Sequence, residues 1–193
     1  MTGDLEKIYD RSGKLDTFIE IVNELVESGE KALIFSQYTE MLTILRRVFD
    51  DRSLKYFYLD GTTPEKSRTQ MKKAFQEGTI PFFLISLKAG GLGMTLTEAN
   101  CVVHYDRWWN PAVEDQATDR VHRIGQTKPV KVFRIHTTGT IEEKLGQLLE
   151  KKKDLFDSVI EVDDLRKEIS KEQIVSPVRP TELAMFVADW PGK

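Results

Sequence analysis

Short apolar runs alternate with amphipathic segments along most of this chain, and this pattern constrains the fold more than any other feature. The apolar runs have the length of buried strands, and the segments between them carry apolar residues at helical spacing. We expect strands at residues 31–36, 56–59, 82–87, 101–105 and 130–136. We expect helices around residues 15–26, 42–49, 64–75, 111–123 and 140–160. Strands that alternate with helices predict an α/β fold with a mainly parallel central sheet flanked by helices.

Local signals mark where several of these helices begin and end. Ser28-Gly29 closes the first helix, because glycine readily takes the backbone conformation that follows a helix. Thr63 before Pro64 has the form of an N-cap with proline at the first helical position. Pro111 and Thr140 mark the starts of the last two helices. These signals agree with the alternation of strands and helices.

Polar and glycine residues follow several of the predicted strands directly. They lie in Ser36-Gln37, in Asp60-Gly61-Thr62 and in the segment from Ser86 to Gly93. Right-handed connections place the loops at the carboxyl ends of parallel strands on one edge of the sheet, where such folds bind ligands. We therefore expect the functional residues to cluster at this edge.

The overall composition fits one domain of ordinary size. A chain of 193 residues can bury an apolar core without disulfides or metals. The single cysteine, Cys101, excludes an internal disulfide and a multi-cysteine zinc site, and its apolar neighbours predict a buried strand position. A net charge of −3 gives no overall basic field, although a local basic groove can lie on an acidic domain. The polar start and the lack of a long apolar run predict a soluble intracellular protein, of cytoplasm, nucleoid or nucleus.

A glycine-rich segment, Ser86 to Gly93, follows the third predicted strand. Glycines there allow the backbone to approach a phosphate or a nucleic-acid strand closely, but a purely structural loop uses glycine equally well. The segment is not a Walker A loop, because no Gly-x-x-x-x-Gly-Lys-Ser/Thr sequence occurs in the chain.

A charged segment near residue 120 carries two arginines on one predicted helical face. Gln116, Arg120 and Arg123 are spaced by four and three residues. Arginines that point the same way can reach adjacent phosphate oxygens with planar, permanently charged donors. The alternative is a solvated face on which these arginines pair with the nearby acidic residues, Glu114, Asp115 and Asp119.

A tryptophan pair follows the fourth predicted strand in the segment 106–111. Trp108 and Trp109 could stack on bases or on another domain, or pack the turn onto the core. Asp106 resembles a Walker B aspartate, but Arg107 stands where the water-polarising glutamate would be. The histidines are spread over separate elements, so no metal site is predicted.

Taken in order, these segments resemble the C-terminal ATPase lobe of the Swi/Snf family within helicase superfamily 2. The tryptophan-rich segment separates that family from the DEAD-box RNA helicases. The matching segments are residues 32–38 for motif IV, residues 59–63 with Arg68 for the motif after it, residues 84–97 for motif V, residues 106–111 for the tryptophan signature, and residues 116–126 for motif VI. The resemblance implies one RecA-like lobe over residues 12–160, followed by a C-terminal extension of residues 161–193 with a short helix and a proline-containing tail.

The resemblance also implies roles for single residues. In such motors ATP binds between two RecA-like lobes, and the second lobe supplies arginine fingers. The implied catalytic residues are Arg120 and Arg123. The implied ATP-binding residues are Gln116, Gly91, Gly93, Arg120 and Arg123. The implied DNA-binding residues are Ser36, Gln37, Gly61, Thr62, Ser86, Lys88 and Trp108. Thr95 stands where the family usually has asparagine, so no contact is carried over to it.

The function implied by the resemblance is that of half a motor. It would translocate on double-stranded DNA with ATP and Mg²⁺ as cofactors, with the Mg²⁺ held by the Walker motifs of the N-terminal lobe. This chain alone is not expected to hydrolyse ATP, because it has no Walker A loop. Two alternatives stay open. The chain could be a nucleic-acid- or protein-docking module that uses Trp108, Trp109 and the tail. The parent could instead act on RNA or RNA polymerase.

Overall fold

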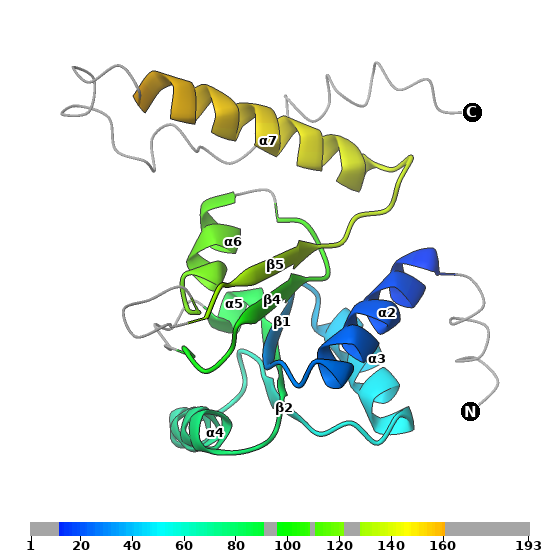
Figure 1. The fold of residues 1–193 in the computed structure, drawn as a ribbon, viewed down its shortest axis with the longest axis vertical. Coiled ribbons are helices and arrows are strands. Elements are labelled where there is room, and N and C mark those ends of the chain that lie inside the picture. The colour runs from blue at the N-terminus through cyan, green and yellow to red at the C-terminus, as the bar shows by residue number, and fades with distance from the viewer. Residues whose placement is uncertain (1–11, 91–95, 109–110, 122–127, 161–193) are drawn as a thin grey trace.

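In the part of the chain that the structure describes, a five-stranded parallel sheet forms the centre of the molecule (Figure 1). This computed structural model describes residues 12–90, 96–108, 111–121 and 128–160. The strands are β1 (Ala32–Ser36), β2 (Tyr56–Leu59), β3 (Phe82–Ser86), β4 (Cys101–His104) and β5 (Lys131–Arg134). Their order across the sheet is β2-β3-β1-β4-β5, and every neighbouring pair is parallel. The predicted α/β fold with a parallel sheet is confirmed.

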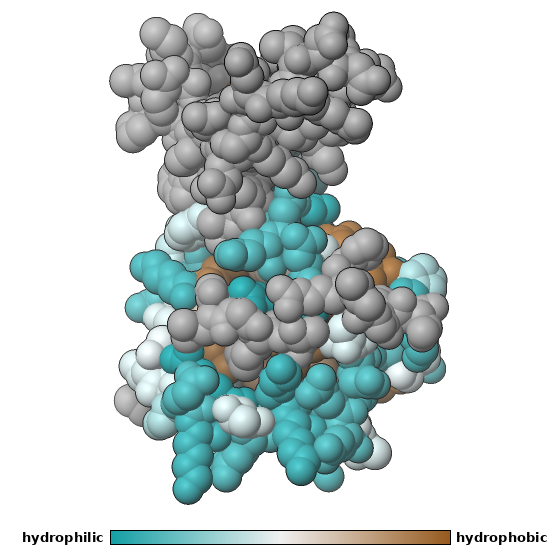
Figure 2. Space-filling view, turned by 90° about the vertical axis from the view of Figure 1, so that its left-hand side faces the viewer, coloured by the Kyte–Doolittle hydropathy of each residue, from teal (hydrophilic) through white to brown (hydrophobic). Residues whose placement is uncertain are grey.

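Helices cover both faces of this sheet. They are α2 (Gly13–Glu27), α3 (Thr39–Asp51), α4 (Glu65–Glu77), α5 (Leu87–Gly90), α6 (Pro111–Thr118) and α7 (Ile141–Ile160). Helices α2 and α3 pack on one face, and α4, α5 and α6 pack on the other (Figure 1). Helix α7 follows β5 and runs along the top of Figure 1. The outer surface around α4, toward the bottom of Figure 2, is mostly hydrophilic.

The core is divided by the sheet into two apolar layers. Successive residues of a strand point to opposite faces, so Ala32 and Ile34 of β1 belong to the layer under α2 and α3. Leu33 and Phe35 belong to the layer under α4, α5 and α6. Burial on both faces explains why the strand sequences are apolar without alternation.

The start of α4 differs by one residue from the prediction. Pro64 is the residue that caps the helix, with extended backbone angles, and it makes no side-chain capping bond. The Thr63 hydroxyl, predicted to cap the helix, instead accepts a hydrogen bond from the Asp60 backbone N–H at 3.1 Å. The turn after β2 therefore takes Thr63 away from the helix.

Helix α6 ends earlier than predicted. It stops at Thr118, whereas the sequence pattern extends it to about residue 123. The backbone N–H groups of Arg120 and Val121 bond to carbonyls three residues earlier, which tightens the chain into a turn. Arg120 therefore follows the helix and does not share a helical face with Gln116. Residues 122–127 lie outside the described part, so the third member of the predicted face, Arg123, does too.

The segment after β3 was predicted to continue the strand to residue 87 and then to form a loop. The strand ends at Ser86, and Leu87–Gly90 form the short helix α5. Leu87 and Ala89 are buried in the layer under α4 and α6, which favours a helical turn over an exposed loop. The later residues of this segment, 91–95, lie outside the described residues.

Cys101 is buried at the start of β4, as predicted. Its thiol donates to a Glu30 carboxylate oxygen at 2.7 Å, and burial together with this carboxylate raises the pKa of Cys101 to about 12. Lys131 at the start of β5 pairs with the same carboxylate at 3.1 Å. These contacts lie at the amino ends of the strands. Among the described helices, none combines the length and apolar character needed to cross a bilayer.

Candidate functional site

The predicted DNA-binding residues lie at the carboxyl edge of the sheet. Because the strands run in the order β2-β3-β1-β4, the loops that follow them form a row in the same order. In that order the row holds Gly61 and Thr62, then Ser86 and Lys88, then Ser36 and Gln37, then Trp108. The parallel register pairs Ser36 directly with Ser86. The structure therefore brings together all the residues that were predicted to bind DNA.

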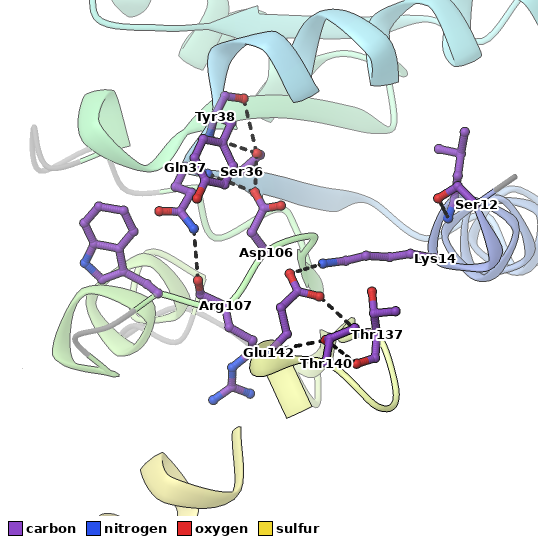
Figure 3. Close-up of polar contacts among 12 residues, drawn as sticks. Ser12, Lys14, Ser36, Gln37, Tyr38, Asp106, Arg107, Thr137, Thr140 and Glu142 are labelled. Carbon is purple, nitrogen blue, oxygen red and sulfur yellow. Dashed lines mark hydrogen bonds and ion pairs between the residues drawn. The ribbon is translucent and has the colours of Figure 1, made fainter. Parts of the chain in front are cut away.

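The loop after β1 is bonded to the loop after β4 through Asp106 (Figure 3). The Ser36 hydroxyl and the Gln37 backbone N–H both donate to one Asp106 carboxylate oxygen, the latter at 3.2 Å. The Gln37 side-chain amide donates to the Arg107 carbonyl oxygen at 3.1 Å. Asp106 is 5% exposed, and burial raises its pKa. In the described conformation Asp106 acts as a structural acceptor that joins the two loops inside the edge.

The turn after β2 is ordered around Asp60. One carboxylate oxygen of Asp60 accepts the Thr62 backbone N–H at 2.9 Å and the Thr62 hydroxyl at 2.6 Å. The other oxygen accepts the Tyr58 hydroxyl at 2.8 Å. These bonds, led by the one from the Thr62 hydroxyl, lower the pKa of Asp60 to about 2. Gly61 and Thr62 are exposed at the tip, and no atom lies within 4 Å of the place where a Gly61 Cβ would stand.

Arg68 of α4 supports this turn from inside. Its Nε donates to the Thr63 carbonyl oxygen at 2.6 Å, and its Nη2 lies 3.4 Å from the carbonyl oxygens of Asp60 and Gly61. The side chain is buried, with the residue 7% exposed. The sequence analysis placed Arg68 in a motif without a predicted role. A buried arginine that binds three carbonyl groups fixes the backbone path of the exposed tip.

The predicted DNA-binding residues differ in accessibility. Gly61, Thr62 and Lys88 are exposed, and Gln37 is half-buried. Ser36 and Ser86 are buried at 0% and 2% exposure. The Ser36 hydroxyl bonds to Asp106 of the loop after β4, and Ser86 is buried beside it in the sheet. Which of these residues touch DNA stays a prediction.

Glu114 of α6 holds the loop that carries Trp108. Its Oε1 accepts the Trp108 backbone N–H at 2.7 Å and lies 3.4 Å from Arg107 Nε. Its Oε2 lies 3.3 Å from Arg134 Nε on β5. The sequence suggested Glu114 only as a partner of Arg120 and Arg123. The structure pairs it with Arg107 and Arg134. An acidic residue in the first turn of a helix was the one signal available.

Of the residues predicted to bind nucleotide, the structure describes two: Gln116 on α6 and Arg120 just after its end. Gln116 is exposed, whereas Arg120 is 6% exposed and its carbonyl oxygen accepts the Leu96 backbone N–H at 3.0 Å. Gly91, Gly93 and Arg123 lie outside the described residues. Within the described ranges, no three His, Cys, Asp or Glu side chains gather in a way that could hold a metal ion.

His104 fixes the end of α6 from the sheet. Its Nε2 lies 3.2 Å from the Thr118 hydroxyl, and its ring stacks on Phe35 with the ring centres 5.6 Å apart. Burial lowers the pKa of His104 to about 3, so the imidazole is neutral at physiological pH. A neutral histidine here packs against Phe35 and bonds to the end of α6.

Comparison with known proteins gives one consistent result. The family described as helicase conserved C-terminal domain matches residues 13–125. The chain is 41% identical over 174 residues to the putative ATP-dependent helicase/translocase YwqA of Bacillus subtilis, covering 88% of this chain and 18% of that protein. It is 39% identical over 189 residues to the human SWI/SNF-related matrix-associated actin-dependent regulator of chromatin subfamily A member 1, covering 95% and 18%.

A solved structure agrees with these relatives. The Sulfolobus solfataricus SWI2/SNF2 ATPase core in complex with dsDNA superimposes with a TM-score of 0.64 at 38% identity, covering 86% of this chain and 36% of that one. The chain thus spans a minor part of each protein that it resembles. Both the sequence and the fold are similar to one segment of larger ATP-dependent proteins.

Proposed function

The chain belongs to the helicase conserved C-terminal domain family as the C-terminal, RecA-like lobe of an SNF2-type ATPase, and from that premise we propose that it is half of a double-stranded-DNA translocase. The observation that carries the proposal is the row of loops along the carboxyl edge of the sheet. The S. solfataricus core that it resembles is described in complex with dsDNA.

On this proposal the exposed members of the row contact the DNA backbone. Lys88 supplies a cation. The Gly61 backbone can approach a DNA strand closely, because glycine has no side chain and the space where a Cβ would stand is open. Ser36 and Ser86 support the loops from inside, where they are buried. Trp108 packs partly against the core and leaves part of its surface at the edge. Contacts to phosphates would give affinity with little sequence preference.

The nucleotide would bind at the end of α6, between this lobe and the N-terminal one. We assign the arginine-finger role to Arg120 and Arg123, and nucleotide contacts to Gln116, Gly91 and Gly93. Arg120 is buried here, so its guanidinium would turn toward the nucleotide as the lobes close. Mg²⁺ would be held by the Walker motifs of the other lobe, because this chain has no Walker A sequence.

The test is the ATPase rate of the two-lobed parent with different nucleic acids. We expect duplex DNA of unrelated sequences to stimulate ATP hydrolysis and single-stranded or duplex RNA to do so much less. The assay measures phosphate release at saturating ATP over a range of nucleic-acid concentrations. Equal stimulation by RNA would favour a motor that acts on RNA. No stimulation by any nucleic acid would favour a docking module.

A further inference from the structure

Glu114 lies at a junction between three elements of the lobe. It belongs to the first turn of α6, and its side chain is 2% exposed. Its carboxylate meets the Trp108 backbone N–H after β4 at 2.7 Å and Arg134 on β5 at 3.3 Å. Arg107, also after β4, approaches the first oxygen at 3.4 Å. One buried carboxylate therefore ties α6 to two neighbouring strand ends.

Stability alone is a weak reason for such an arrangement. Taking a carboxylate and guanidinium groups out of water costs free energy, and apolar residues of similar size often serve a core equally well. Glu114 does something that an apolar residue could not do: it fixes the relative positions of α6 and the Trp108 loop. The Trp108 backbone N–H and Arg134 Nε both donate to this carboxylate, and Arg107 Nε lies 3.4 Å from it without a hydrogen bond. These contacts fix the start of α6 against the Trp108 loop.

The other end of α6 is also fixed. The Thr118 hydroxyl donates to the Glu114 carbonyl oxygen at 3.0 Å and lies 3.2 Å from His104 Nε2. Arg120 follows two residues later. The helix is thus held at both ends. The Trp108 loop is bonded to its start, and two of the residues proposed to bind nucleotide lie on the helix (Gln116) and just after its end (Arg120). A shift of the loop at one end would move the other end.

We propose that Glu114 is a positioning residue that couples DNA binding at the Trp108 loop to nucleotide binding at the end of α6. This inference rests on the proposed function. Coupling is reciprocal, so the affinity for DNA should change with bound nucleotide through this residue, and the affinity for nucleotide should change with bound DNA by the same factor.

The experiment uses the two-lobed parent with Glu114→Gln. Glutamine has the same shape and can still accept the Trp108 N–H, but it carries no charge for Arg107 and Arg134. The readout is the ratio of the Kd values for one duplex measured with and without a non-hydrolysable ATP analogue. We expect the wild type to show a ratio of about 5 or more, and E114Q to fall to below about 2.

Asp115→Asn is the matched control. It removes the same charge from the next residue of the same helix. The Asp115 side chain, however, is 44% exposed, and its single contact with Arg134 Nη2 is long, at 3.9 Å. We expect D115N to keep the wild-type ratio. A general loss of stability would weaken both Kd values of E114Q in parallel and leave their ratio unchanged. An unchanged ratio, or an equal loss in D115N, would overturn the inference.

A second variant covers the case in which E114Q does not fold. Arg134→Gln removes one arm of the junction and leaves the Trp108 bond and Arg107 in place, and we expect it to lower the ratio part of the way. If R134Q kept the full ratio, the inference would also fail. A wild-type parent with no DNA-stimulated hydrolysis would defeat the proposed function itself, whereas a normal wild type with an unchanged E114Q ratio would defeat this inference alone.

Discussion

At the scale of single residues, Lys88 is the clearest exposed cation in the row of edge loops. It stands on α5, two residues after the buried Ser86 and within the proposed DNA track. Lys55 is a matched cation at the amino ends of the strands, because it is exposed and directly precedes β2. The two lysines carry the same charge but face different ends of the parallel strands.

Replacing Lys88 with alanine should weaken DNA binding by the parent about equally for unrelated duplexes. One phosphate contact fewer releases one counterion fewer, so the slope of log K against log salt should fall by about one unit. A salt titration of wild type, K88A and K55A on two unrelated duplexes checks this. K55A should keep the wild-type slope. A loss of affinity in K88A that is limited to one duplex, or an unchanged slope, would show that Lys88 does not contact the DNA backbone.

The sequence predicted which residues reach the edge but not how they are used there. Ser36 and Gln37 are adjacent, yet Ser36 is buried against Asp106 while Gln37 is half-buried outside the strand. That difference depends on a residue 70 positions later, which no local pattern contains. Glu114 shows the same limit, since spacing suggested partners on its own helix and the fold supplied Arg107 and Arg134.

At the scale of elements, the start of α7 is attached to the start of α2. Lys14 Nζ pairs with the Glu142 carboxylate, whose other oxygen accepts the Thr137 backbone N–H at 3.0 Å (Figure 3). Burial acts to raise the pKa of Glu142, but the bond from Lys14 and its charge leave it below its usual value. The Lys14 ammonium also lies 5.1 Å from the centre of the Tyr105 ring. Residues 128 positions apart thus anchor α7 to α2.

Removing this anchor should loosen α7 without unfolding the sheet. We expect Glu142→Gln to lower the free energy of unfolding by about 1 kcal/mol, because the pair is only partly buried. Hydrogen exchange should speed up at the first turn of α7 more than in β1 or β3. Glu150→Gln is the control, since Glu150 is exposed on the same helix. The anchor would be without effect if both variants exchanged like the wild type.

The sequence predicted the elements better than their ends. Strand β2 begins and ends where the apolar run does, and α7 begins after Thr140 as expected, because these limits follow from local residue types. The end of α6 did not follow from local signals. Thr118 contacts His104 on β4, and the Leu96 backbone N–H donates to the Arg120 carbonyl oxygen. These tertiary contacts end the helix there.

At the scale of the whole molecule, the strand order places the loops with proposed DNA contacts next to one another along one edge of the sheet. The sequence predicted parallel strands, but the order β2-β3-β1-β4-β5 depends on which strands pair in space. That order places the loop after β1 at the centre, between the loops after β3 and β4. A groove across both lobes would therefore be lined on this side by loops from most of the sheet.

The chain by itself should not hydrolyse ATP at the rate of a motor. Arginine fingers stabilise charge on a phosphoryl group that other residues must first bind, and no Walker A sequence is present here to hold the β- and γ-phosphates. We therefore expect the purified chain to release phosphate at the background rate, with or without duplex DNA. An Arg120→Ala version of the same chain, purified identically, is the control for contaminating ATPases. Equal traces of activity in both preparations would come from contaminants. DNA-stimulated release by the wild-type chain that disappears in R120A would show instead that this lobe binds and turns over ATP alone, and the division of labour between two lobes would be wrong for this protein.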